Sequence, residues 1–509
     1  MHLPRRSFLA LAAAALPLRS ARAARELRVL APDLPRVLDP HLALTPLDRA
    51  VASETFLGLV TRDALGALVP GLAESWTESP DGTTYTFALR RDARWSDGSQ
   101  ITAQDVAFSF QRALDPATAA PFAPVLGRIS GAPGKPAVQA DGRATVSITL
   151  SRRSTRFLES LAHPVAAVVP RAIVSRAGAA WLNAARPVCS GPFIPVRQGA
   201  ALERNPNTVL PSLADAVRFE TAESFEAAVE RIRGGGADLA FGFAPEPISD
   251  RNLQRTLRFD RGQAVASIAI NTSRPKLGTR EIRHALGMLI DRERLVRSLR
   301  ITNATAAYAP VPPDVKTAPE AHPAPYSKID ADDRRVIAQV LLQEENISPA
   351  QPGTFRLLHL PGRVNTAIVK AVSESWAKAG VGLDVQMRSA GDYGNALMAG
   401  DYDLALVTSR EIGATAVPYL TQFAKAAGPD NLPRYAEEDY ETQLETAAIS
   451  LDANGVSVAI GNAEGLLAED QIVAPLFAFR PGQPVESGLG GWEPNATGIH
   501  PLRLIAPRS

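Results

Sequence analysis

The chain has 509 residues, of which 45% are hydrophobic and 21% are charged, and its formal net charge at pH 7 is +1. This length predicts two or more lobes rather than one domain. The hydrophobic and charged fractions are those of an ordinary globular protein, which excludes a disordered chain and a membrane-embedded one. The sequence shows no clustered basic face, so we expect no nucleic acid among its partners.

The first 23 residues have the pattern of an export signal peptide. A basic pair at 5–6 precedes an apolar run over 8–18, and residues 21–23 read A-R-A, a typical cleavage signal. The pair followed by S-F-L is similar to the twin-arginine signal for export of folded chains, and a general-secretion signal is the alternative. No cysteine stands at the cleavage site to carry a lipid anchor. We therefore expect a periplasmic protein that is soluble after cleavage.

The mature chain is slightly acidic. The signal peptide holds four arginines and no acidic residue, so 50 of the 54 basic side chains remain against 53 acidic ones. The single cysteine, Cys189, excludes an internal disulfide even in an oxidising compartment. We expect this thiol to be buried and inert.

Motifs for catalysis, phosphate binding and metal binding are incomplete. GAPGKP at 131–136 lacks both the first glycine and the hydroxyl residue of a nucleotide-binding loop. The seven histidines show no metal-binding spacing, and Ser190 lacks the G-x-S-x-G surroundings of a nucleophile. We expect no cofactor, no metal site and no enzymatic activity; a secreted hydrolase acting through Cys189 or Ser190 is the alternative.

The stretch from 94 to 116 contains two carboxylates that invite an active-site interpretation. Residues 83–90 alternate polar and apolar side chains as a half-buried strand does, and Asp97-Gly98 is a turn signal. Thr102 is a candidate helix N-cap, and Asp105 stands where the second member of a capping box belongs. Both carboxylates therefore have structural roles, and we do not expect a catalytic pair.

Helices and strands alternate in the rest of the chain. A helix is predicted from Asn365 to the glycine at 380, followed by strand 381–387, a short helix over 392–398 and a buried strand at 403–409. The stretch 224–243 repeats this plan with a glycine turn at 234–236. This alternation is typical of an α/β lobe.

The order of several motifs carries a family resemblance. These motifs are LDPH at 38, ETFLGLVTRD at 54, VPGLAESW at 69, DGTTYTFALR at 81, WSDGSQITAQDVAFSFQRALDPATAAPF at 95, SGPF at 190, RNPN at 204, AINT at 269 and REIRHALGMLIDRERLV at 280. The chain resembles the extracytoplasmic solute-binding proteins of the peptide and nickel class of ABC importers, family 5, and among them the oligopeptide-binding members most. The resemblance is strong to about residue 313 and thins in the C-terminal third.

The resemblance implies an α/β, two-lobed periplasmic binding protein of type II, cluster C-like, with an additional N-terminal subdomain and hinge-linked lobes. After the signal peptide at 1–23, the expected division is lobe I at 24–52, 151–265 and 476–509, the additional subdomain at 53–150, and lobe II at 266–475. The apolar segments 264–273 and 471–480 are expected to cross between the lobes.

The resemblance also implies a function. Such a protein binds peptides or peptide-like small solutes in an interlobe cleft, closes by hinge motion, and delivers its ligand to a permease driven by separate ATPase subunits. We expect a monomer. A ligand-sensing periplasmic receptor without transport is an alternative, and so are a nickel-chelate binder and an opine binder.

Position against the family pattern implies four sets of ligand-lining residues: a loop at 41–46, a loop at 241–245, a loop at 408–412 and the two crossings. The candidates are His41, Leu44, Thr45, Pro46, Phe243, Asn271, Ser409, Arg410, Glu411, Ile412, Phe477 and Phe479. The alternative role for each is that of an ordinary surface loop or of a packed hinge residue.

The loop at 408–412 departs from the family. Relatives place a tryptophan and an aspartate there, and the aspartate pairs with the free amino group of a peptide. This chain reads TSREIGATAVPYL from 408 to 420. Glu411 can substitute as the anion, and Arg410 can bind a carboxylate in bidentate fashion. A modified peptide, an opine-like conjugate and another small polar solute remain alternatives to an oligopeptide.

Overall fold

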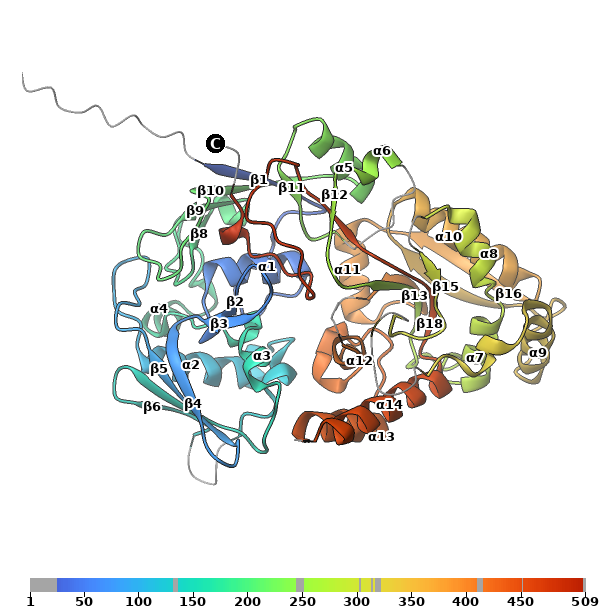
Figure 1. Cartoon of the computed structure of the whole chain (residues 1–509), viewed down its shortest axis with the longest axis horizontal. Coiled ribbons are helices and arrows are strands. Elements are labelled where there is room, and N and C mark those ends of the chain that lie inside the picture. Colours follow the sequence, from blue (N-terminus) through green and yellow to red (C-terminus); the bar gives the residue numbers. More distant parts are fainter. Residues whose placement is uncertain are drawn as a thin grey trace, which may run out of the picture.

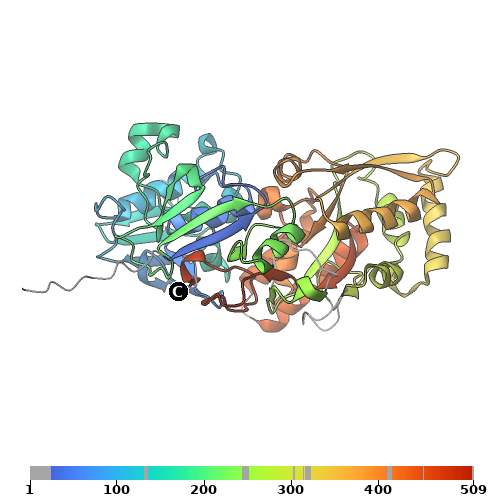
Figure 2. The same ribbon diagram turned by 90° about the horizontal axis from the view of Figure 1, so that it is seen from above.

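The computed structural model describes residues 25–130, 136–243, 251–301, 304–312, 315, 322–409, 415–450 and 452–506. The chain forms two lobes that lie side by side along the long axis of the molecule (Figure 1, Figure 2). Residues before 260 and after 481 build lobe I, and the residues between them build lobe II. None of the helices in the described part of the chain combines the length and the apolar character that a bilayer crossing requires.

Lobe I is built around a five-stranded sheet in the order β11-β1-β10-β9-β8. Its strands are β1 (Glu26–Ala31), β8 (Phe193–Val196), β9 (Ala201–Arg204), β10 (Ala216–Thr221) and β11 (Leu239–Ala240). The helices that accompany it are α1 (Pro46–Thr55), α5 (Phe225–Arg233) and α6 (Arg251–Gln254). Because β1 runs parallel to β10 and β11, the carboxyl ends of these three strands share one edge of the sheet.

A second, antiparallel sheet in the order β4-β5-β7-β6 forms a subdomain of lobe I. Its strands are β4 (Ala73–Glu78), β5 (Thr84–Leu89), β6 (Val138–Asp141) and β7 (Thr145–Thr149). The remaining elements are the hairpin β2 (Val60–Arg62) and β3 (Leu68–Pro70) and the helices α2 (Ala103–Leu114), α3 (Phe157–Leu161) and α4 (Arg171–Ala177). The apolar face of α2, with Val106 and Phe110, packs into one core with Phe87 and Val146 of the sheet.

The structural interpretation of Asp97 and Asp105 is confirmed. Thr102 Oγ1 accepts a hydrogen bond from the Asp105 amide at 3.4 Å, and Asp105 Oδ2 accepts one from the Thr102 amide at 2.9 Å. This is the predicted capping box, at the start of α2. Asp97 Oδ1 accepts a hydrogen bond from the amide of Ser99 at 2.9 Å and thus closes the turn that precedes α2.

Lobe II contains a six-stranded sheet in the order β14-β18-β13-β17-β15-β16. Its strands are β13 (Ala264–Ile270), β14 (Thr305–Ala306), β15 (Gly353–His359), β16 (Val381–Met387), β17 (Leu404–Thr408) and β18 (Val473–Phe479). β15 is parallel to β16 and β17, whereas β13 is antiparallel to β17 and β18. The carboxyl ends of β15, β16 and β17 therefore share one edge of this sheet.

Helices cover both faces of the lobe II sheet. One core joins the sheet to α7 (Arg280–Met288), α8 (Arg292–Leu299), α9 (Ala331–Glu344) and α10 (Arg363–Ala377). The core on the other face joins it to α11 (Ala390–Ala399), α12 (Val417–Thr421), α13 (Glu438–Ile449) and α14 (Ala453–Asp470). The helix predicted from 365 and the strand predicted at 381–387 correspond to α10 and β16.

The two segments expected to cross between the lobes, 264–273 and 471–480, form β13 and β18 instead. Both strands are fully buried and pair with each other inside the lobe II sheet. The chain passes between the lobes at 260–263 and 480–481, next to a ribbon in which β12 (Leu257–Phe259) pairs with β19 (Gly482–Pro484). Residues 264–265 and 476–479, which the prediction gave to lobe I, thus belong to the sheet of lobe II, because their backbone groups pair there. The other predicted lobe limits stay predictions.

The capping box gives a test of the packing of α2. We expect Thr102→Ala to lower the free energy of unfolding by about 0.5–2 kcal/mol, because the substitution removes the hydroxyl that accepts from the Asp105 amide and donates to Asp105 Oδ2. Gln111→Ala, at an exposed position on the same helix, is the matched control and should change stability by less than about 0.5 kcal/mol. Urea unfolding of the mature chain measures both, and equal values for the two variants would contradict the prediction.

Candidate functional site

The carboxyl ends of the parallel strands in both sheets meet at the junction of the lobes. Gly391, at the start of α11 after β16, lies so close to the loop after β1 that an added Cβ would stand 2.7 Å from Asp33 Oδ2 and 3.0 Å from Arg36. The loop after β10 and the loop after β15 likewise line one groove. In open α/β sheets this edge is where ligands bind. The candidate site is therefore the space between these loops.

One hollow at this junction, the inner cavity, is narrow and has a volume of about 20 Å³. Its lining residues all belong to lobe II and come from β13, β17, β18, the segment after β14 and the segments around α12: Val265, Ser267, Ala269, Pro310, Val407, Thr408, Ser409, Gln422, Phe423, Asp430, Leu432, Pro433 and Val473. Among these residues Asp430 is the one charged side chain. It forms an ion pair of 3.2 Å with Arg49 on α1 of lobe I, so the cavity reaches the interlobe contact.

A second hollow, the outer groove, lies between the lobes and has a volume of about 460 Å³. Lobe I contributes Glu223, Ser224 and Glu226, and lobe II contributes Pro361, Gly362, Arg363 and Thr366. Ser224 is the N-cap of α5 and Gly362 that of α10, so both helices begin at the groove. Arg363 and Glu226 form an ion pair of 3.6 Å across it. The outer groove thus combines charges of both signs.

The predicted loop at 408–412 begins in the inner cavity. Thr408 and Ser409 line the cavity at the carboxyl end of β17. Ser409 Oγ accepts a hydrogen bond from the Val265 amide at 3.0 Å, and the Ser409 amide donates to the Val265 carbonyl at 2.9 Å. These bonds fix the point at which the chain leaves the sheet. Arg410, Glu411 and Ile412 lie outside the described residues.

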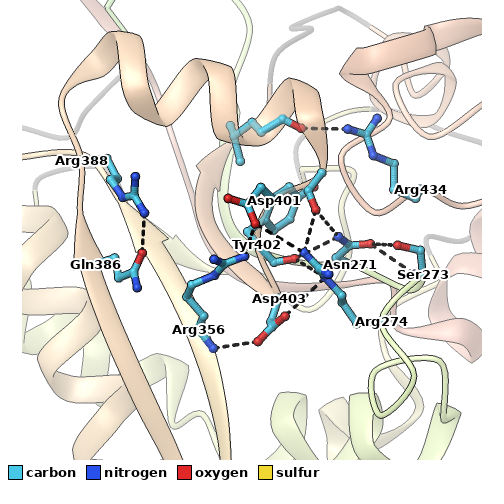
Figure 3. Close-up of polar contacts among 12 residues, drawn as sticks. Asn271, Ser273, Arg274, Arg356, Gln386, Arg388, Asp401, Tyr402, Asp403 and Arg434 are labelled. Carbon is cyan, nitrogen blue, oxygen red and sulfur yellow. Dashed lines mark hydrogen bonds and ion pairs between the residues drawn. The ribbon is translucent and has the colours of Figure 1, made fainter.

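Asn271 lies at the opposite end of the lobe II sheet. In the antiparallel register Ile270 faces Leu404, the first residue of β17, whereas Ala266 faces Thr408 at its end. The Asn271 side chain is fully buried, and its Nδ2 donates to the carbonyls of Gly400 and Tyr402 at 3.1 and 2.9 Å (Figure 3). Its polar atoms hold this turn, so we remove Asn271 from the candidate site.

His41 is 1% exposed and forms part of a buried polar network. Its Nε2 lies 3.0 Å from the Ala167 carbonyl, which can only accept a hydrogen bond, so Nε2 carries the proton. Nδ1 then accepts from Arg112 at 2.8 Å, and Arg112 also binds Asp39 with both terminal nitrogens. Burial lowers the pKa of His41 to about 4. The imidazole is fully occupied inside lobe I and does not reach the cleft.

The neighbouring candidates Leu44, Thr45 and Pro46 build the start of α1. Thr45 is the N-cap, and its Oγ1 accepts from the Asp48 amide at 3.1 Å in a second capping box. Pro46 is the exposed first residue of the helix, and Leu44 packs against the subdomain core. Their positions are explained by helix initiation, and none of them lines either hollow.

The three aromatic candidates also have packing roles. Phe243 meets Phe225 edge-on at a ring distance of 6.2 Å, beside the outer groove but not in its lining. Phe477 and Phe479 are 0% and 1% exposed and point into the core between the lobe II sheet and its first set of helices. The family pattern placed these two at a crossing, but β18 carries them into the sheet.

The lining residues that sequence reasoning did not find include two groups. Ser224 and Gly362 directly follow parallel strands, and that position was a usable signal. Gln422, Phe423 and Asp430 come from the irregular segment after α12, well beyond the end of β17. No local pattern in the sequence marks these three, because only the folding of this segment over the sheet brings them to the cavity.

Comparison with known proteins identifies the family. Residues 67–431 match the family of bacterial extracellular solute-binding proteins, family 5 middle region. The chain belongs to this family. The periplasmic oligopeptide-binding protein OppA of Haemophilus influenzae is 27% identical to this solute-binding protein over 490 residues, with 90% of each chain covered. The periplasmic murein peptide-binding protein MppA of Escherichia coli is 26% identical over 492 residues, covering 91% of this chain and 89% of MppA.

Solved structures share the two-lobed fold. The H. influenzae OppA complex with the peptide RPPGFSPFR superposes with a TM-score of 0.83 at 24% identity, over 96% of this solute-binding protein and 100% of OppA. A structure of E. coli MppA, also 24% identical, has a TM-score of 0.84 over 96% of this chain and 99% of MppA. The unliganded open form of MppA reaches only 0.60, over 96% of this chain and 97% of MppA. The lobes of this structure are therefore arranged less like those of the open form.

Burial of His41 gives a prediction for the pH dependence of stability. The folded pKa is about 4, below the 6.5 of the unfolded chain, so unfolding takes up a proton between these values. Stability should therefore fall as the pH drops from 7 to 5, with His41 contributing on the order of 2 kcal/mol. His41→Gln keeps a donor and an acceptor but cannot titrate. Urea unfolding at several pH values should show a flatter profile for this variant, and identical profiles would contradict the assignment.

Proposed function

We propose that this solute-binding protein is the periplasmic substrate-binding component of an ABC importer. It captures peptides or peptide-like small solutes between its lobes and presents them to a permease, while ATP is hydrolysed by separate subunits. The observation that carries the proposal is the cleft in which the parallel strands of both sheets end. The relatives named for oligopeptide and murein peptide binding support the ligand class.

The charges around the cleft favour a polar ligand. The inner cavity is lined by the Asp430 carboxylate, which pairs with Arg49, and the outer groove is lined by Arg363, which pairs with Glu226, and by Glu223. A ligand with separated positive and negative groups, such as a short peptide, can complement both hollows at once. Main-chain pairing with the ligand would leave its side chains free to vary, which suits a protein that accepts many sequences.

Binding without chemistry is part of the proposal. Cys189 is fully buried, and burial raises the pKa of its thiol well above the usual range, so the reactive thiolate is suppressed. Ser190 is 1% exposed, and its Oγ accepts a hydrogen bond from the Leu57 amide at 2.9 Å. Neither residue is presented to a ligand. These contacts support a tight structural turn over a hydrolytic nucleophile.

We further propose that the chain is exported by the twin-arginine route, is cleaved after residue 23 and acts as a soluble periplasmic monomer. The basic pair, apolar run and A-R-A sequence of residues 1–23 support export, although they precede the described residues. The relatives named as periplasmic point to the same compartment.

The ligand itself provides the first test. Mass spectrometry of the small molecules released when the purified mature chain is denatured should identify peptides or peptide-like solutes. Returning the released fraction to ligand-free protein should shrink the radius of gyration in small-angle scattering. A screen of peptides and small polar metabolites that gives neither a retained ligand nor compaction would reject the proposal. Recovery of an opine or a nickel chelate would reassign the ligand class but keep the importer role.

Filling the inner cavity should block binding. Ser267 lies on β13 at the cavity wall, and Ser267→Leu places two more heavy atoms there. We expect this variant to weaken ligand binding by about tenfold or more, since overpacking costs ~1–3 kcal/mol. Ser267→Ala leaves the space open and is the matched control. Calorimetry with the released ligand should separate the two variants, and equal affinities would place the ligand elsewhere in the cleft.

Substitutions of the charged residues Arg410 and Glu411 test whether these side chains bind the charged ends of the ligand. We expect Glu411→Gln to weaken binding of a ligand with a free amine by about 1.5–3 kcal/mol, the usual strength of a charged hydrogen bond. Arg410→Ala should weaken the binding of anionic ligands and leave the binding of cationic ligands nearly unchanged. Calorimetry with an amine-blocked and an unblocked form of the same peptide distinguishes these effects. Unchanged affinities would remove the two side chains from the site.

A further inference from the structure

The two lobes contact each other directly at the end of the cleft that is remote from the hinge. Arg128, in the subdomain of lobe I, forms a bidentate ion pair with Glu445 on α13 of lobe II; Nη1 and Oε1 are 2.9 Å apart, and Nη2 contacts Oε2. Arg152 Nη1 lies 3.5 Å from the same Oε1. We call these three residues the closing clamp.

Uncharged contacts accompany the closing clamp. The amide and the hydroxyl of Thr155 each donate to the Ala448 carbonyl at 3.0 Å, at the end of α13. Nearby, Gly428 of lobe II approaches lobe I so closely that an added Cβ would lie 2.8 Å from the Pro121 carbonyl oxygen. The subdomain and α13 therefore form a continuous interlobe contact rather than a single surface ion pair.

The position of this contact makes it sensitive to lobe motion. In Figure 1 the α13–α14 hairpin runs along the bottom of the view and ends beside the subdomain, whereas β12 lies near the top, where the chain crosses between the lobes. When the lobes rotate about the crossings at 260–263 and 480–481, the parts of the two lobes that lie farthest from these crossings move apart most. The closing clamp must therefore break when the lobes open, and it re-forms only when they close.

We propose that the closing clamp stabilises the closed conformation without ligand and thereby sets the closed fraction of the free protein. Its charges belong to the two lobes and need no bound solute to meet. Apparent ligand affinity scales with the fraction of protein that is already competent to bind. The subdomain thus tunes affinity through residues that lie outside the lining of either hollow.

The two arginines of the closing clamp contribute unequally to the stability of the closed conformation. The side chains of Arg128 and Glu445 are 28% and 29% exposed, and their fork-to-fork geometry is the strong arrangement for arginine and a carboxylate. Arg152 is 67% exposed and adds little. Ion pairs of this kind weaken with salt, so the closed fraction should depend on ionic strength. The Arg49–Asp430 pair also joins the lobes, but Asp430 lines the inner cavity, and its substitution would mix closure with ligand contact.

The test uses the full mature chain freed of ligand by unfolding, dialysis and refolding. Single-molecule energy transfer between dyes on the two lobes measures the closed-to-open ratio, and small-angle scattering measures the average size. We expect Glu445→Gln to lower the closed-to-open ratio about two- to fivefold. In the wild type, raising the salt concentration from about 0.05 to 0.5 M should also lower the ratio, and the variant should respond less to salt because, among the residues that the structure describes, only the Arg49–Asp430 and Arg363–Glu226 pairs then remain between the lobes.

A matched control and a second variant isolate the interlobe pair. Glu26→Gln removes a partly exposed ion pair with Arg218 that lies wholly within lobe I, so it should leave the closed-to-open ratio unchanged. Arg128→Gln should reproduce most of the Glu445→Gln effect, and the double variant should add little to either, as expected for one shared interaction.

An unchanged ratio in Glu445→Gln, or additive effects in the double variant, would overturn the proposal. Because no ligand enters the measurement, either result is independent of the proposed peptide specificity.

Discussion

The pairing of β13 with β18 inside the lobe II sheet is the constraint on which the two-lobed arrangement depends. Both strands are fully buried, and each continues directly into a crossing between the lobes. The two crossings therefore start side by side from a rigid core and reach lobe I next to the β12–β19 ribbon. This geometry leaves the lobes joined by two short, adjacent crossings, about which they can rotate as bodies. A cleft that opens and closes follows from it.

The same constraint decides which polar residues are available to a ligand. Asn271 and His41 are polar and lie in segments that the family pattern associates with ligand, yet all their polar atoms are bonded within the protein. A buried polar group must be satisfied somewhere, and these two are satisfied by the fold itself. Ser267, Thr408 and Asp430 instead line the inner cavity of lobe II, which reaches the interlobe contact at the Arg49–Asp430 ion pair. Residue type does not separate the two groups, whereas position relative to the strand ends does.

Closure of such a protein draws on two sources of free energy. The ligand contributes by binding both lobes at once, and the contacts between the lobes contribute whether or not a ligand is present. The bidentate pair of Arg128 with Glu445 belongs to the second source. Dividing the free energy in this way lets the cleft residues set which solute is bound while residues far from the hinge set how readily the lobes close.

The sequence by itself determined the local elements and the family. The Thr102 capping box, the helix predicted from Asn365 and the alternating strand at 381–387 follow from near-neighbour chemistry, and the ordered motifs point to family 5. Only the tertiary structure decided that 264–270 and 473–479 are sheet strands rather than crossings, and that Asn271 and Ser409 lie at opposite ends of one sheet. A buried apolar run looks the same in either role, because local periodicity carries no information about register or long-range pairing. For the same reason, no local pattern marks Asp430 as a lining residue: the folding of the segment after α12 over the inner cavity places it there.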